Sequence, residues 1–292
     1  MLDTVLSVSR RDWLKATATG ALLVGLRGTS GLAKDAAQKR PGLSLQLYSV
    51  RNDCSKDLDQ VLKQVAEMGF EAVEFAGYHK YAGDAAGLRK QLDACGLKVA
   101  GTHIGANSLT GDALPKSIDY HQTIGCKYLC VPGDGRFTDP VKSKEFAELM
   151  NRAAEELKKV GMACGYHNHT HEFNKDGDTS YWELFAQRTS QDVVLQQDVG
   201  WTVAAGEDPV ALIRKYPGRS KIIHCKPTVV GGQGRPIVGE DSVPWAEIFQ
   251  ACVEVGGTEW YTIEQEAYLP GVSPMECVKL SLAGLKRILA GG

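Results

Sequence analysis

From Leu43 to the C-terminus, the chain alternates short apolar runs with longer segments whose apolar residues recur every three to four positions. Short runs of this kind are typical of buried β-strands, and the longer segments are typical of helices that cover a sheet. In the first long segment, Val61, Leu62 and Val65 share one helical face, which Gly69 ends. Repetition of this unit limits the chain to folds built from successive strand–helix pairs.

Eight strands and eight helices follow from this pattern. The predicted strands are Leu43–Val50, Phe70–Phe75, Leu97–His103, Lys127–Val131, Met162–His167, Asp192–Asp198, Ser220–Cys225 and Thr258–Glu264. The predicted helices are Asp57–Met68, Leu88–Ala94, Ala113–Ile124, Val141–Val160, Tyr181–Arg188, Pro209–Tyr216, Pro244–Val255 and Pro274–Leu289. They predict an α/β fold, a single (β/α)8 TIM barrel. An open doubly wound sheet is the alternative, but Leu45–Arg51 lacks the glycine-rich phosphate loop expected after its first strand.

The N-terminus differs in kind from the rest of the chain. Arg10 and Arg11 precede a mildly apolar stretch, residues 16–26, and the small-residue sequence 31–33. This arrangement predicts a twin-arginine-type signal peptide over residues 1–33, a linker over 34–41 and the barrel over 42–292. An amphipathic N-terminal helix is the alternative. We therefore expect an exported, periplasmic protein.

Charge and cysteine spacing exclude several classes of protein. The formal net charge of −2 offers no basic surface for nucleic acid. No run of about 18 apolar residues is present, so we expect no stable membrane span. The eight cysteines contain no CxxC pair, which argues against a zinc ribbon or a thioredoxin-like site. The sequence leaves disulfide pairing and oligomeric state open.

Potential metal ligands stand at the ends of four late strands: His167, Asp198, His224 and Glu264. The carboxyl ends of barrel strands share one rim, so these side chains could meet. Imidazole nitrogens with carboxylate oxygens suit Mn²⁺, Zn²⁺, Fe²⁺, Co²⁺ or, less well, Mg²⁺, and we favour Mn²⁺ or Zn²⁺.

Each of these residues also has a simpler interpretation. A histidine after a strand is often only a hydrogen-bonded loop residue, Asp198 could cap a turn before Gly200, and Glu264 could pair with Lys226. His169 competes with His167 for the metal, because positions i and i+2 of a strand face the same side. Four coincidences at neighbouring strand ends nevertheless favour one shared site.

Other polar residues on the same rim could carry the chemistry and bind the substrate. The candidate acid–base residues are Glu74, Glu266, His103 and His169. The candidate substrate-binding residues are Gln46, Tyr48, Trp201 and Lys226. Glu74 could instead form a structural ion pair, and Glu266 could instead support Lys226 or His224.

Several motifs together resemble the sugar phosphate isomerase/epimerase group of xylose-isomerase-like barrels. They are Gln46–Arg51, Val73–Gly77, Thr102–Gly105, Tyr166–His169 with Glu172, Asp198–Trp201, His224–Lys226 and Ile263–Glu266. The resemblance implies a TIM barrel with a divalent metal at the carboxyl rim. The chain departs from many members of the group at His167, where they carry glutamate, and at Trp201, where sugar epimerases often carry histidine.

The resemblance implies aldose–ketose isomerisation or epimerisation through an enediolate. One alternative is a metal-dependent lyase or dehydratase that acts on keto-sugars, 3-keto glycosides or inososes. A non-catalytic carbohydrate-binding barrel is the second alternative. In each case the partner is a small-molecule sugar or keto-sugar.

Overall fold

The computed structural model describes residues 40–291. The predicted signal peptide and all but the last two residues of the predicted linker lie outside this range. Among the helices between residues 40 and 291, none combines the length and the apolar character needed to cross a bilayer.

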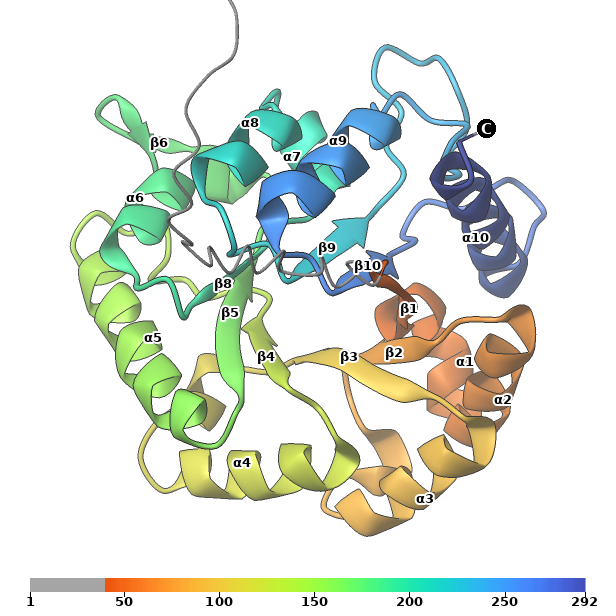
Figure 1. Cartoon of the computed structure of the whole chain (residues 1–292), viewed down its shortest axis with the longest axis horizontal. Helices are drawn as coiled ribbons and strands as arrows, with labels where there is room; N and C mark the ends of the chain where they lie inside the picture. Colours follow the sequence, from red (N-terminus) through yellow and green to blue (C-terminus); the bar gives the residue numbers. More distant parts are fainter. Residues whose placement is uncertain (1–39, 292) are drawn as a thin grey trace, which may run out of the picture. The chain divides into compact units, whose positions relative to one another are not determined.

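A parallel eight-stranded sheet forms the centre of the described chain (Figure 1). Its strands are β1 (Gly42–Gln46), β2 (Ala72–Phe75), β3 (Lys98–His103), β4 (Tyr128–Val131), β5 (Ala163–His167), β8 (Val194–Gln196), β9 (Ile222–Cys225) and β10 (Trp260–Ile263). The sheet order is β8-β5-β4-β3-β2-β1-β10-β9. An isolated parallel bridge between Asp198 and His224 joins the two end strands. The predicted (β/α)8 barrel is thereby confirmed, with β8 and β9 as its most sparsely paired neighbours.

Helices follow the strands in chain order. They are α1 (Arg51–Lys56), α2 (Leu58–Met68), α3 (Ala85–Cys95), α4 (Ala113–Ile124), α5 (Lys142–Lys159), α6 (Tyr181–Arg188), α7 (Val199–Ala204), α8 (Pro209–Lys215), α9 (Trp245–Ala251) and α10 (Pro274–Leu289). A two-stranded hairpin, β6 (Lys175–Asp176) with β7 (Thr179–Ser180), precedes α6. Local signals set the helix ends: Asp57 caps α2 by accepting from the Gln60 N–H at 3.1 Å, and Gly69 ends it with a φ of 87°.

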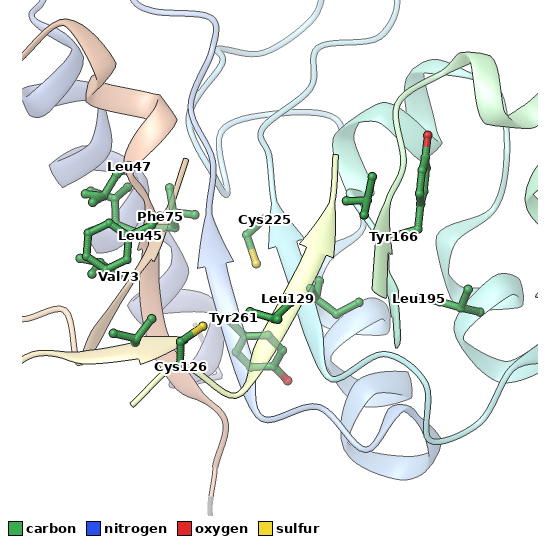
Figure 2. Close-up of a cluster of buried hydrophobic side chains, with 14 of the residues drawn as sticks. Leu45, Leu47, Val73, Phe75, Cys126, Leu129, Tyr166, Leu195, Cys225 and Tyr261 are labelled. Atoms are coloured by element: carbon green, nitrogen blue, oxygen red, sulfur yellow. The ribbon is translucent and has the colours of Figure 1, made fainter. Parts of the chain in front are cut away.

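Two apolar clusters divide the core. The larger one lies between the strands and the helices and includes alternate strand residues such as Leu45 and Val73. Figure 2 shows part of it, with Leu45, Val73 and Phe75 gathered on one side of the view. The smaller cluster contains Tyr128, Val194 and Ile222, each the first residue of its strand, and Ala163 and Trp260 pack against it.

Polar side chains continue the barrel interior beyond the smaller cluster. Ser44 and Thr262 share a hydrogen bond of 2.5 Å, two residues further along their strands than the register pair Gly42 and Trp260. Layers of branched apolar residues commonly fill such barrels. Here only the amino-terminal part is apolar, and the carboxyl part is left to buried polar groups.

Two predicted strands end earlier than expected. The prediction of a strand over Leu43–Val50 is wrong at its end: β1 stops at Gln46, and residues 47–50 form a 3₁₀ turn. The reason is local, because the Gln46 side chain accepts from the Tyr48 N–H at 3.0 Å and caps that turn. Similarly, β8 stops at Gln196, and Asp198 begins the short helix α7, which the sequence pattern missed.

Candidate active site

The four predicted metal ligands converge at the carboxyl rim. Each of them offers one ligand atom, and these atoms lie within 4.8 Å of one another. The Nδ1 atom of His224 is 2.5 Å from Glu264 Oε2 and 4.0 Å from Asp198 Oδ2. His167 Nε2 lies 3.9 Å from the same Glu264 oxygen. All four side chains are buried, so the group forms a compact set of two imidazoles and two carboxylates.

Asp198 serves the helix and the cluster with different oxygen atoms. Its Oδ1 accepts from the Trp201 N–H at 2.8 Å and caps α7. Its Oδ2 is buried and has no hydrogen-bond partner among residues 40–291. Because a buried carboxylate oxygen without a partner is costly, a cation at this position would satisfy it. The cap and the metal ligand predicted as alternatives are therefore compatible, and the donor set fits a divalent ion.

The backbone around Asp198 is held by close packing. Asn168 accepts from the Asp198 N–H at 2.9 Å through its side-chain oxygen. At Gly200 a Cβ atom would stand 2.6 Å from the Lys226 carbonyl oxygen, so only glycine lets α7 approach the end of β9 this closely. Both residues lie within the motifs named above, but the sequence pattern predicts no such role for them.

Glu74 lies behind His224 rather than in the open cavity. Its Oε2 is 2.6 Å from His224 Nε2, and its Oε1 accepts from the Gln196 side chain at 2.7 Å. The carboxylate is fully buried. This arrangement suits a group that orients the His224 ring, so that Nδ1 faces the cluster. It does not place Glu74 where a substrate carbon could reach it.

These contacts change the protonation of the buried groups. Burial opposes a charge on His224, but the Glu74 and Glu264 carboxylates outweigh it and raise the pKa of His224 to about 10. Burial would raise the pKa of Glu74, yet the neighbouring His224 and His103 hold it below its ordinary value. In the metal-free protein, His224 is therefore an imidazolium between two carboxylates.

The two carboxylates of the cluster respond in opposite directions. Burial raises the pKa of Asp198 despite the Lys226 ammonium 3.8 Å away. For Glu264, Lys226 and His224 outweigh burial and hold the pKa well below its usual range. Glu264, the carboxylate in contact with His224 and 3.6 Å from Lys226, is thus ionised over a wider pH range than Asp198.

A cavity of about 420 Å³ opens beside the cluster. Its lining consists of ten residues: Tyr48, Ala76, His103, Ile104, Gly105, Pro132, His167, His169, Glu264 and Glu266. Two of the four clustered ligands are thus exposed to a bound molecule. Three of the predicted acid–base residues, His103, His169 and Glu266, are also in this wall, whereas Gln46 is fully buried and does not line the cavity.

The hydrogen bonds of His103 fix its tautomer. The Gln196 amide nitrogen donates to Glu74, so the Gln196 oxygen must be the acceptor towards His103 Nε2 at 2.8 Å. His103 therefore carries its proton on Nε2, and Nδ1 keeps a lone pair. Burial lowers the pKa of His103, which favours this neutral form. Gln196 is not among the site residues predicted from the sequence. Its position two residues before Asp198 in the predicted strand, on the same face, was the signal that could have identified it.

His169 is separate from the ligand cluster. It groups with His171 and Glu172 instead, and its backbone N–H donates to Glu172 Oε2 at 2.8 Å. Glu172, part of the same sequence motif, is fully buried and accepts from the Tyr166 hydroxyl at 2.9 Å. Glu172 thereby fixes the loop that carries His169 into the cavity wall.

Lys226, Glu266 and Trp201 meet at the edge of the cavity. Lys226 Nζ is 2.5 Å from Glu266 Oε1 and 5.0 Å from the centroid of the Trp201 ring. Trp201 and Lys226 line a neighbouring cavity and not the first one, while Glu266 lines both. The expected support of Lys226 by Glu266 is present, together with a carboxylate that reaches the cavity.

Comparison with known proteins gives the same fold and a narrow range of chemistry. The inosose dehydratase of Geobacillus kaustophilus is 23% identical over 272 residues, which cover 79% of this chain and 87% of that protein. A sugar phosphate isomerase/epimerase structure from Parabacteroides distasonis superimposes with a TM-score of 0.71 at 27% identity, covering 86% of this chain and 96% of that one. An L-ribulose 3-epimerase at 16% identity and a TM-score of 0.63, covering 85% and 94% of the two chains, shares the fold. Residues 62–287 match the family described as xylose isomerase-like TIM barrel, and the chain belongs to that family.

Proposed function

We propose that this protein is a divalent-metal-dependent isomerase or epimerase that moves a proton at a carbon next to the carbonyl of a sugar or keto-sugar. The observation that carries the proposal is the unpartnered Asp198 Oδ2 within a buried two-imidazole, two-carboxylate set beside a ligand-sized cavity. His167, Asp198, His224 and Glu264 would hold the ion. When bound there, it would polarise the carbonyl and make the adjacent C–H bond acidic.

The residues in the cavity wall then divide the work of proton transfer. His103 offers an unprotonated Nδ1, and His169 and Glu266 stand elsewhere in the same wall. One of them removes the proton, and a second returns it to the neighbouring carbon or to the opposite face of the same carbon of the enediolate. Tyr48, at the exposed mouth, is placed to contact the sugar.

The donor set limits the metal. It contains nitrogen and carboxylate oxygen and no thiolate, which suits Mn²⁺, Zn²⁺, Fe²⁺, Co²⁺ or Mg²⁺. Two imidazoles among four ligands favour Mn²⁺ or Zn²⁺ over Mg²⁺, which prefers oxygen ligands. Elemental analysis of the purified protein tests this choice.

A lyase or dehydratase acting on a keto-sugar, a 3-keto glycoside or an inosose is the second candidate. The similarity to inosose dehydratases over most of both chains favours it. The first step is the same proton abstraction, and the difference is that a group is expelled from the enediolate instead of a proton being returned. The Lys226–Glu266 pair beside the cavity could supply a proton to a departing oxygen.

Reaction in D₂O separates these candidates. The metal-loaded protein is incubated with keto-sugars and inososes, and the products are examined by NMR and mass spectrometry. We expect deuterium at the carbon next to the carbonyl, with the mass otherwise unchanged. Loss of water or of an aglycone would favour the lyase. Sugar binding with no exchange, unaltered in a folded Asp198→Asn variant, would indicate the non-catalytic barrel.

We also propose that residues 1–33 direct export by a twin-arginine route, followed by the 34–41 linker, and that the 42–292 barrel works in the periplasm. All eight cysteines lie in the described range, seven of them are buried, and all are free thiols. Such a chain suits folding before it meets an oxidising compartment. Replacing Arg10 and Arg11 by lysine should retain the protein in the cytoplasm, as measured by cell fractionation.

A further inference from the structure

A second cavity, of about 480 Å³, adjoins the catalytic one, and the proposed proton transfer makes no use of it. Helix α7 contributes Trp201 and Ala204 to its wall, and the loop after β9 contributes Val229 and Pro236. Glu266 lines both cavities, so the two meet at this residue. A molecule bound beside the ligand cluster could therefore extend into the second cavity.

The walls of the two cavities differ in chemistry. The catalytic cavity presents imidazoles and carboxylates, whereas the second presents mainly alanine, valine, proline and indole surfaces. Its charged groups, Lys226 and Glu266, are paired with each other at the junction. A sugar needs hydrogen-bonding partners over its whole surface, so the second cavity suits an apolar group better than a second sugar ring.

Trp201 supplies the flat part of this wall. Its indole Nε1 is buried from solvent, so a molecule in the cavity meets the ring and not the N–H group. The indole ring offers a flat apolar surface against which another ring can stack.

We propose that the second cavity is a subsite for an apolar, ring-shaped substituent of the substrate, such as the aryl group of an aryl keto-glycoside. This inference rests on the proposed function, because it places the sugar in the catalytic cavity. The sugar would lie beside the ligand cluster, the linking oxygen near Glu266, and the ring against Trp201 and Val229.

A pair of unreactive probes tests the subsite directly. Calorimetry on the purified full chain compares phenyl β-D-glucopyranoside with methyl β-D-glucopyranoside. Because a phenyl ring removes far more apolar surface from water, we expect it to bind at least about tenfold more tightly. Equal affinities for the two probes would overturn the proposal.

Variants locate the preference within the cavity. Val229→Trp fills it from the loop after β9, and Ala204→Trp fills it from helix α7. Val230→Trp adds the same ring at the next position, which is 51% exposed and outside the cavity lining. We expect both filling variants to lose the preference for the phenyl probe and the control to keep it. A preference that survives both filling variants, or that disappears in the control as well, would contradict the subsite.

The binding measurement tests the subsite, and the exchange measurement tests the proposed function. The probes do not react, so their affinities are independent of turnover. Phenyl preference without deuterium exchange on any keto-sugar would leave the subsite standing and reject the proposed function. Exchange on keto-sugars with no phenyl preference would reject the subsite alone.

Discussion

The early and late strands of the barrel end on the same rim but bring different groups to it. Strands β5, β9 and β10 and the turn after β8 deliver His167, His224, Glu264 and Asp198, whose ligand atoms meet. Strand β2 delivers Glu74, which is fully buried and bonded to His224 and Gln196. Strand β1 ends at Gln46, which is also fully buried and caps the next turn through its Oε1 but has no partner for its Nε2 among residues 40–291. The late strands thus offer donors to a cation, and Glu74 from the early strands holds one of these donors, His224, in place.

The contact between Glu74 and His224 joins the two halves across the barrel. An imidazole that ligates through Nδ1 needs a partner at Nε2 to fix its orientation. Glu74 supplies it from a strand that lies three positions away from β9 in the sheet order. Both carboxylate oxygens of Glu74 have a partner, whereas Asp198 leaves its Oδ2 without one among residues 40–291.

The largest expected effect comes from removing a late-strand ligand. In His224→Ala, the cluster loses one of four donors, and we expect metal affinity to fall by more than the roughly 10–100-fold typical of losing a supporting group. Turnover should fall with it. Metal content by elemental analysis and turnover on a keto-sugar provide the measurements, and circular dichroism reports whether the barrel remains folded.

His171→Ala is the matched control, since this imidazole lies on the same rim and is 52% exposed. Metal content should be unchanged there. Near-normal metal in His224→Ala would show that the ligand set is wrong.

The second largest effect is expected from changing Glu74, the early-strand residue that contacts His224. Glu74→Gln keeps the size of the side chain but removes the charge opposite His224 Nε2, so we expect metal affinity to fall about 10–100-fold. Titration with Zn²⁺ or Mn²⁺ against a competing chelator measures it. Glu71→Gln, which changes a partly exposed carboxylate three residues earlier, should bind metal normally. A loss as large as that of His224→Ala would make Glu74 a ligand itself.

A third, pH-dependent effect follows from the raised pKa of His224. With a pKa of about 10, His224 is protonated at neutral pH in the metal-free protein, and the metal must displace that proton. Between about pH 7, above which Asp198 is ionised, and about pH 10, affinity should therefore rise by up to about tenfold per unit, and each ion bound should release about one proton. Calorimetry in buffers of different ionisation enthalpy counts the protons.

In Glu74→Gln the charge that raises this pKa is gone, so fewer protons should be released. Equal proton release in the two proteins would mean that Glu74 does not control the protonation of His224.

The sequence predicted the site residues of the late strands better than the roles of those on the early strands. His224 lies near the end of β9 and Glu264 directly follows β10. The apolar run that predicts each strand therefore also places its potential metal ligand at the carboxyl end of that strand. The strand endings at Gln46 and Gln196 depend on a side-chain cap and on the short helix α7, neither of which changes the apolar pattern. The position of Glu74 behind His224 depends on closure of the barrel, which brings together residues 150 positions apart.

The smallest expected effect concerns Gln196, a late-strand residue whose side chain hydrogen-bonds to Glu74 and His103 but to none of the four proposed metal ligands. Its amide donates to Glu74 and accepts from His103, so Gln196→Met removes two hydrogen bonds while keeping most of the volume. Glu74 Oε1 remains 3.3 Å from His103 Nε2 and can still accept from it. We therefore expect kcat to fall only about tenfold, the equivalent of one hydrogen bond. Metal content should stay near normal, because both contacts of His224 are intact. If metal were lost in parallel with kcat, Gln196 would act through the ligand cluster and not through the tautomer of His103.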